Sequence, residues 1–358
     1  MATDGAASEG QVVTAASPEP ETPQPAAGRR VRAGIGRVIR APSASVVLAT
    51  VLLVFLIGAL RPNFLQASQM FDILQGSAYV GLLAAGMAYL IAMREIDLSV
   101  GSMFGLCLIS VALFIRSGIN PWLAALGGIV VGGALGAVNA TIVAYIRIPT
   151  IVATLATLSV YRGLTSGVTG GDQVVNLPVD NSFFTVMGGK VGDVPMAVIV
   201  LAVVVLVVSL VLHHTPFGYR VLAIGSNPEA AAFSGISVVR VRAQVLILTG
   251  VLAGIAGVLG LAFFTSGDPN IGLGFELQAI AAAVIGGTPL RGGSATVLGA
   301  AFGAILLNVV ASGLSYFSIP ANWTNFATGM VILLAVGVDS FVRSRREAQK
   351  QKAIGIGM

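Results

Sequence analysis

The sequence predicts an all-α, polytopic membrane protein with about ten transmembrane helices and both termini in the cytoplasm. Three observations predict this fold class. Hydrophobic residues make up 56% of the 358 residues, only 10% are charged, and the mean hydropathy is +0.91; a soluble domain has about 25% charged residues. Because one spanning helix uses about 20 apolar residues, ten spans are the natural upper limit. A soluble enzyme is excluded.

Residues 1–43 are expected to form a disordered cytoplasmic tail that ends in arginines. The stretch from residue 1 to about 28 is rich in Ala, Pro, Glu, Ser and Thr, and it cannot bury enough apolar surface to offset the entropy of ordering. The first apolar run, 44–60, begins too late for a secretory signal peptide and lacks a small-residue cleavage site. We therefore expect it to be retained as the first span.

The transmembrane domain is expected at 44–342, and a basic cytoplasmic tail at 343–358. Charged residues, proline or other polar residues bound each apolar run. The runs lie at 44–60, 76–93, 101–116, 121–145, 150–167, 195–212, 243–266, 278–289, 295–314 and 325–342. The run at 278–289 is too short to cross as a regular helix and ends in Gly286-Gly287-Thr288-Pro289, which favours a half-helix or a re-entrant segment.

The distribution of Lys and Arg predicts the orientation. With the N-terminus inside, 16 of the 20 basic residues fall on the cytoplasmic side, and the outer loop 168–194 carries three aspartates. Both termini can lie in the cytoplasm only if the chain crosses the membrane an even number of times. We therefore count the short run at 278–289 as one of ten crossings. The net charge of +5 does not indicate nucleic acid binding, because the basic residues flank apolar runs and form no separate domain.

Glycines at intervals of four residues predict close helix packing. They occur in three of the expected spans, at Gly128, Gly132 and Gly136, at Gly250 and Gly254, and at Gly299 and Gly303. Such spacing makes a flat helix face on which two backbones can approach.

Motifs for nucleotides and metals are lacking. Gly189-Lys190 is followed by Val191 and has no glycine five residues before it, so it is not a phosphate loop. Gly272-x-Gly274 lacks the third glycine of a dinucleotide site. His213 and His214 are adjacent, which is a poor spacing for metal ligands on a helix. We expect no catalytic residue, metal or cofactor in this chain.

The cytoplasmic loop at about 213–242 is expected to contain a short helix. Asn227 or Ser226 can cap its start, and Pro228 suits the first turn. Glu229 complements the positive end of the helix dipole, and Gly235 can end the helix. The small residues Ala230, Ala231 and Ala232 leave room for close contact, and Phe233 adds one bulky apolar side chain. A generic surface helix lying among lipid headgroups is the alternative.

The residues Glu229-Ala-Ala-x-x-x-Gly235 resemble the EAA-type loop of importer permeases of the ABC transporters. Further stretches resemble the ribose/xylose-type sugar permeases of the inner membrane, and together they span about 44–342. They are 95–102, 149–155, 161–163, 274–282 and 286–288. Many ribose-type members have a glycine pair where this chain has Arg94-Glu95, and Glu95 is more similar to the xylose-like members.

The resemblance implies a multi-pass permease of the cell membrane that lies in the lipid bilayer and pairs with a second copy of itself. It implies ABC ATPase subunits that hydrolyse ATP on a separate chain, and an extracytoplasmic sugar-binding protein. The cargo would be a small neutral sugar, most simply a pentose such as ribose or xylose. The residues that would couple the chain to the ATPase are Asn227, Glu229, Ala230, Ala231, Phe233 and Gly235.

Polar residues inside the membrane mark candidate positions along the translocation path, because burying such groups against lipid is costly. They are Asp97, Ser99, Asn139, Thr150, Thr154, Arg162, Glu276 and Asn308. Structural roles are open as well: helix capping for Asp97, Ser99 and Glu276, a position at the membrane surface for Arg162, and helix–helix hydrogen bonds for both asparagines.

Two alternative functions stay open. One is a secondary transporter that a proton or sodium gradient drives through Asp97 or Glu276. The other is an ABC permease for nucleosides or branched-chain amino acids. A membrane-embedded enzyme is disfavoured, because the adjacent His213 and His214 and the single cysteine, Cys107, which lies in an apolar run, do not form a catalytic cluster.

Overall fold

The structure is a computed structural model that describes residues 42–320 and the isolated positions 323, 326, 327, 329, 330, 333 and 337. Nearly all of the expected N-terminal tail, most of the expected tenth span at 325–342 and the whole basic tail at 343–358 lie outside the described residues.

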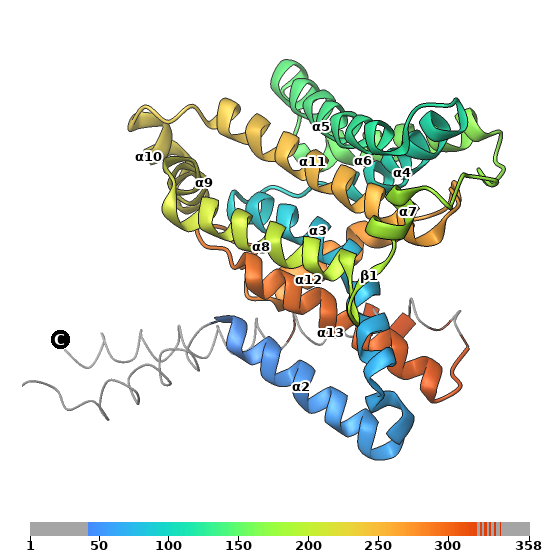
Figure 1. The fold of residues 1–358 in the computed structure, drawn as a ribbon. Coiled ribbons are helices and arrows are strands. Elements are labelled where there is room, and N and C mark those ends of the chain that lie inside the picture. Colours follow the sequence, from blue (N-terminus) through green and yellow to red (C-terminus); the bar gives the residue numbers. More distant parts are fainter. Residues whose placement is uncertain are drawn as a thin grey trace, which may run out of the picture. The chain divides into compact units, whose positions relative to one another are not determined.

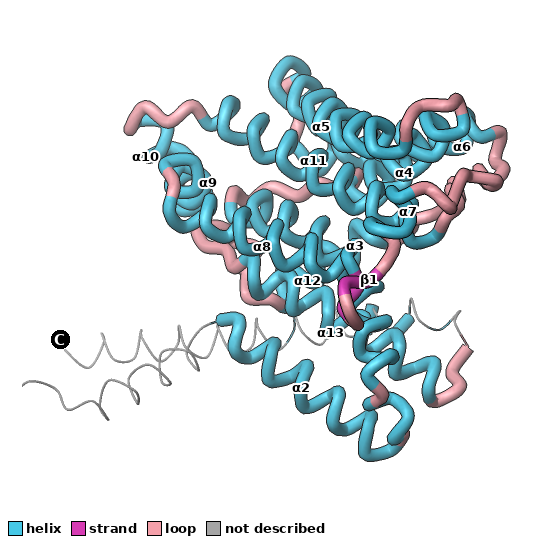
Figure 2. The backbone as a smooth tube through the Cα atoms, in the orientation of Figure 1, coloured by secondary structure: helices cyan, strands magenta, loops and turns pink. Residues whose placement is uncertain are grey.

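The regular secondary structure of the described residues is almost entirely helical (Figures 1 and 2). Nine long or apolar helices in residues 42–320 match the first nine expected runs. They are α2 (Pro42–Leu60), α3 (Ala67–Ala92), α4 (Val100–Arg116), α5 (Pro121–Ile146), α6 (Thr150–Thr169), α8 (Met196–His214), α11 (Val238–Phe264), α12 (Phe275–Ile285) and α13 (Val297–Tyr316). Six are long and apolar enough to cross a membrane, whereas α2, α4 and α12 count as shorter apolar helices within the described residues. The all-α, polytopic fold class is confirmed.

The shorter elements lie in the connections. The 3-10 helix η1 (Pro62–Leu65) joins α2 to α3. The loop between α6 and α8 contains α7 (Ser182–Met187) and a hairpin of β1 (Lys190–Val191) and β2 (Val194–Pro195), in which Lys190 pairs with Pro195. The loop between α8 and α11 contains α9 (Pro216–Ser226) and α10 (Pro228–Phe233).

Helix α3 forms the centre of the bundle. Its side chains are buried almost without interruption from Ser77 to Ala92, and it packs against α11, α12, α13 and α8 (Figure 1). The helix starts at Ala67, well before the apolar run at 76–93. Its polar first turns are held by α13, because the Tyr316 hydroxyl donates to Gln69 Oε1 at 2.9 Å.

Glycines bring α5 and α11 into backbone contact, as their spacing predicted. A Cβ on Gly132 would collide with the carbonyl oxygen of Gly250, and one on Gly136 would collide with that of Leu246. The third expected glycine face also packs: Gly299 lies against Gly286, and Gly303 lies against Ala282 of α12. Both helix pairs therefore approach more closely than any larger side chain permits.

Helix α12 is a half-helix that returns the chain to the end of α3. Its 11 residues span about 16 Å, roughly half of a hydrocarbon core. The connection that follows reaches α3, because the Gly293 N–H donates to the carbonyl of Ala92, the last residue of that helix, at 2.9 Å. The short run therefore forms a half-helix, as its length predicted, and the chain after it contacts the end of α3.

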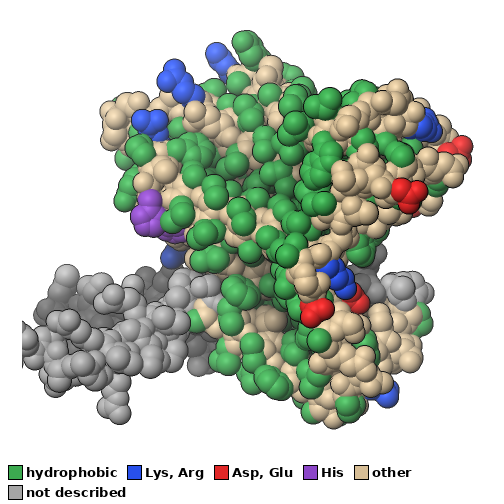
Figure 3. All heavy atoms as spheres, in the orientation of Figure 1, with side chains coloured by type: hydrophobic (Ala, Val, Ile, Leu, Met, Phe, Trp, Pro, Cys, Tyr) green, Lys and Arg blue, Asp and Glu red, His purple; other side chains and the backbone are tan. Residues whose placement is uncertain are grey.

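Apolar side chains cover much of the described surface on the face that Figure 3 shows. Large exposed ones occur on α5, α6 and α8, among them Leu126, Val130, Tyr145, Leu155, Val160, Val203 and Leu206. A soluble protein rarely exposes so large an apolar area, whereas lipid chains cover it without cost.

Candidate functional site

One end of the bundle gathers the residues that sequence analysis assigned to coupling. We call it the α10 end and define it by Ala92 at the end of α3, Ser226 at the end of α9, Arg242 near the start of α11, and Gly293 after α12. The Ala92 carbonyl accepts a hydrogen bond from Gly293. After the end of α3, Arg94 bonds to Ser226 and Glu95 forms an ion pair with Arg242.

The expected short helix is present as α10. The side chain of Asn227 caps it, since Oδ1 accepts a hydrogen bond from the Ala230 N–H at 3.1 Å. Gly235 ends it with φ +83°, and the Ile236 N–H donates to the Ala231 carbonyl at 3.0 Å. This is a Schellman ending, in which glycine takes the left-handed conformation without strain.

Most of α10 faces outward. Ala231 is buried against the bundle, but Phe233 is 93% exposed, and Glu229 and Ala230 are exposed as well. A capped helix that exposes an aromatic ring is typical of a contact surface.

Helix α9 was not expected from the sequence. The Thr215 hydroxyl accepts from the Gly218 N–H at 3.3 Å, and Pro216 occupies the first turn. The Thr-Pro pair was the available signal, because both residues are typical of helix starts.

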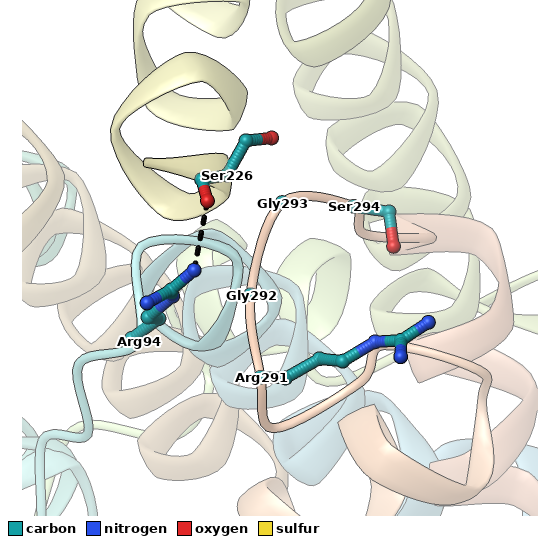
Figure 4. A pocket seen from close by; sticks show the side chains of 6 residues that line it. All are labelled: Arg94, Ser226, Arg291, Gly292, Gly293 and Ser294. Carbon is teal, nitrogen blue, oxygen red and sulfur yellow. Dashed lines mark hydrogen bonds between the residues drawn. The ribbon is translucent and has the colours of Figure 1, made fainter. Parts of the chain in front are cut away.

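A pocket of about 490 Å³ opens at the α10 end. Figure 4 shows its lining: Arg94, Ser226, Arg291, Gly292, Gly293 and Ser294. Arg94 lies directly after α3 in the left-handed conformation, with φ 64°, which costs about 1–2 kcal/mol for a residue with a side chain. Its guanidinium donates to the carbonyls of Gly225, at 2.7 Å, and Ser226, at 2.8 Å. The sequence offered no signal for this contact.

Inside the bundle, three of the predicted path residues form one hydrogen-bonded cluster. Asp97 Oδ1 accepts from the Ser99 N–H at 2.7 Å and from the Ser99 hydroxyl at 2.6 Å. The Asn139 amide donates to Asp97 Oδ2 at 3.3 Å and to Ser99 Oγ at 2.8 Å. All three side chains are fully buried. Neutral donors thus compensate the carboxyl group on both oxygens.

Helix α6 borders this cluster. Thr154 Oγ1 accepts from the Leu98 N–H at 3.1 Å and donates to the Thr150 carbonyl at 2.9 Å. The buried Thr150 hydroxyl has no partner within the part of the chain that the structure describes. Tyr161 is not among the predicted path residues, yet its hydroxyl donates to Asn139 Oδ1 at 3.0 Å. Its position seven residues after Thr154, on the same face of α6, was the available signal.

Arg162 and Glu276 approach α4 from two different elements. The Arg162 guanidinium donates to the Ile271 carbonyl at 2.6 Å and lies over Gly105, and the Glu276 carboxylate lies over Gly101. Glu276 Oε2 is buried, and no group among the described residues donates a hydrogen bond to it. The starts of α4 and α12 thus meet inside the bundle around this acceptor.

Asn308 lies apart from these residues. Its amide donates to the Ile73 carbonyl at 2.6 Å and to Ser77 Oγ at 3.3 Å, which joins α13 to α3. Among the residues that the structure describes, no three His, Cys, Asp or Glu side chains gather in a way that could hold a metal ion.

Comparisons with known proteins extend over most of the chain. Residues 69–336 match the family described as "Branched-chain amino acid transport system / permease component". This chain belongs to that permease family. The permease is 35% identical to the ribose import permease protein of Escherichia coli K12 over 82% of this chain and 92% of the relative.

Two further relatives are also named as permease proteins of transport systems. The permease is 32% identical to the L-arabinose ABC transporter permease protein of Azospirillum brasilense, over 94% of this chain and 99% of the relative. It is 34% identical to the autoinducer 2 import system permease protein of Yersinia enterocolitica, over 85% of each chain. No solved structure gives a significant match. The chain is thus an ABC sugar-transport permease and a multi-pass protein of the inner membrane.

Proposed function

We propose that this permease forms the membrane path for a small neutral sugar and is driven by ATP hydrolysis on a separate partner chain. The observation that carries the proposal is the exposure of Phe233 on the capped helix α10. An exposed ring on an ordered helix gains most when a second protein covers it. The residues proposed to contact the ATPase are Asn227, Glu229, Ala230, Phe233 and Gly235, while Ala231 seats α10 on the bundle.

The proposal places the α10 end and both termini in the cytoplasm. The support is the excess of basic residues on that side. In this arrangement an extracytoplasmic binding protein delivers the sugar at the opposite end, and a second copy of the permease completes the path.

A pentose is the proposed cargo. Two relatives are named for ribose and L-arabinose, which supports a pentose such as ribose or xylose. A sugar is neutral and rich in hydroxyl groups, so its path needs hydrogen-bonding partners but no fixed charge.

The proposed path runs past the Glu276 carboxylate and the Arg162 guanidinium. Glu276 Oε2 lacks a donor, and a sugar hydroxyl can supply one once α4 and α12 separate. Asp97, Ser99, Asn139, Thr150 and Thr154 are proposed to border the path. Asn308 is proposed to fasten α13 to α3 instead, because its amide already bonds to α3.

The test is reconstitution in proteoliposomes, with the permease either alone or together with an ABC ATPase and a sugar-binding protein from the same organism. We expect uptake of radiolabelled ribose, xylose or L-arabinose only in the complete system with ATP on the ATPase side. Accumulation by the permease alone under a proton or sodium gradient would overturn the proposal.

A substitution tests the docking role separately. We expect Phe233→Ala to lower the amount of ATPase that copurifies in mild detergent by tenfold or more. The matched control is Leu273→Ala, which truncates an exposed apolar side chain outside α10 and should leave copurification unchanged. Full recovery of the ATPase with Phe233→Ala would remove α10 from the interface.

A further inference from the structure

Helix α10 is held between two other helices at its own end of the bundle. Helix α9 ends at Ser226, directly before α10, and α11 begins at Val238, five residues after it. A partner that displaces α10 therefore acts first on the end of α9 and on the start of α11.

Arg94 clamps the end of α9. Its guanidinium bonds to the carbonyls of Gly225 and Ser226, which belong to the last turn and have no partner within the helix. The positive charge also suits the negative end of the helix dipole. A Cβ on Gly225 would collide with the Ala92 carbonyl, so the ends of α9 and α3 are in direct backbone contact.

The backbone at Arg94 points to a role for its side chain. The Arg94 N–H donates to Ile91 and the Glu95 N–H donates to Leu90, both at 2.9 Å. Arg94 therefore occupies the left-handed position of a Schellman ending, with φ 64°. Glycine fits this position without strain, yet an arginine holds it and uses its guanidinium on α9.

Glu95 clamps α11 in the same way. Its Oε1 lies 2.6 Å from Arg242 Nη2, in the second turn of α11, and the two side chains are only 16% and 27% exposed. Water screens such a half-buried pair less than a fully exposed one.

The residues that follow reach into the bundle. Asp97 bonds to Asn139 of α5, Leu98 bonds to Thr154 of α6, and Val100 begins α4. The segment 94–99 thus contacts α9 and α11, which flank α10 in the chain. It also contacts α5 and α6 at the buried polar cluster, and it leads directly into α4.

We infer that Arg94 and Glu95 are positioning residues that transmit displacement of α10 to α4, α5 and α6 through the segment 94–99. The inference rests on the proposed docking of an ATPase on α10. Without these two contacts in this chain, α10 is joined to the path helices only through its own connections, and less of the work of the ATPase reaches the path.

The first test replaces Arg94 with glycine in the complete transporter. Arg94→Gly removes the clamp and relieves the backbone strain, so thermal stability should be unchanged or higher. We expect sugar transported per ATP hydrolysed to fall at least fivefold, while the ATPase copurifies as in the wild type. A wild-type ratio in a stably folded Arg94→Gly protein would overturn the inference, because a clamp that only supported the fold would show itself in stability.

The second test exchanges the charges of the ion pair. Glu95→Arg and Arg242→Glu should each lower sugar transported per ATP at least fivefold through like-charge repulsion. The double variant E95R/R242E should recover it to within twofold of the wild type. Failure of the double variant to recover, with normal amounts of protein in the membrane, would overturn the role of the pair.

Copurification separates these results from a failure of the proposed function. If Phe233→Ala and the wild type bind the ATPase equally, α10 is not the docking site, and the transmission inference falls with it. If only the Phe233 variant loses the ATPase, while the clamp variants keep it and lose the transport ratio, both proposals stand.

Discussion

The amide of Asn139 on α5 donates to the carboxyl group of Asp97, 42 residues earlier in the chain, across an Nδ2–Oδ2 distance of 3.3 Å. Both side chains are fully buried. The same amide group also donates to Ser99 and accepts from Tyr161. The neutral side chain of Asn139 therefore joins three elements: the segment that precedes α4, helix α5 and helix α6.

Removal of this amide should destabilise the bundle. In Asn139→Leu, Asp97 Oδ2 loses its only donor among the described residues, and an unsatisfied buried acceptor costs about 1–3 kcal/mol. We expect a lower midpoint of thermal unfolding in detergent. Thr141→Val is the control on the same helix, because its exposed hydroxyl bonds only to its own helix, at Ala137. Equal midpoints for the Asn139 variant and the wild type would contradict the prediction.

The glycine contact between α5 and α11 should tolerate no side chain. Gly132→Leu would force the two backbones apart, since even a Cβ meets the Gly250 carbonyl, and overpacking costs about 1–3 kcal/mol or more. We expect a large loss of folded protein in size-exclusion chromatography. Gly167→Ala on α6, where nothing lies within 4 Å of the added Cβ, should elute as the wild type does.

Two substitutions of Glu276 distinguish a neutral-sugar path from an ion-driven one. Glu276→Gln keeps a carbonyl acceptor and removes the charge, so sugar uptake by the complete transporter should stay within a few-fold of the wild type. Glu276→Leu removes the acceptor and should raise the KM for transport about tenfold, since one lost hydrogen bond costs about 1–1.5 kcal/mol. Loss of all uptake in Glu276→Gln would favour a mechanism that needs the carboxylate.

Changes at the two ends of α10 should uncouple ATP hydrolysis from transport. Glu229→Lys places a positive charge at the positive end of the helix, and Gly235→Pro is incompatible with φ +83°. We expect normal amounts of membrane-embedded protein, with sugar uptake reduced tenfold or more. Ser234→Ala, which loses only an exposed bond to Ala230, is the control. Wild-type uptake in both variants would remove the docking role.

Local chemistry made α10 predictable. Asn227, Pro228 and Gly235 each satisfy a requirement of a helix end, and all three act in the structure as expected. The glycine spacing likewise predicted the close packing of helix backbones that Gly132 and Gly250 make, because a flat glycine face lets two membrane helices approach each other. The spacing did not reveal which two helices would meet.

The candidate path was only partly predictable. Polarity alone makes Asp97 and Asn139 candidates, and nothing in their spacing indicates that they bond to each other or to Tyr161. Polarity also makes Asn308 a candidate, but its amide joins α13 to α3. Polarity inside an apolar run identifies a group that needs a partner, but the partner comes from elsewhere in the chain.

The sequence by itself determined the all-helical membrane fold, nearly all of the described spans and the capped helix α10, because hydropathy and helix-end chemistry depend on neighbouring residues. Only the tertiary structure decided that Arg94 clamps α9, that Glu95 pairs with Arg242, and that Glu276 lies over Gly101 without a donor. These contacts join residues more than 100 positions apart, and how helices pack is set by the fit of whole surfaces rather than by any local pattern.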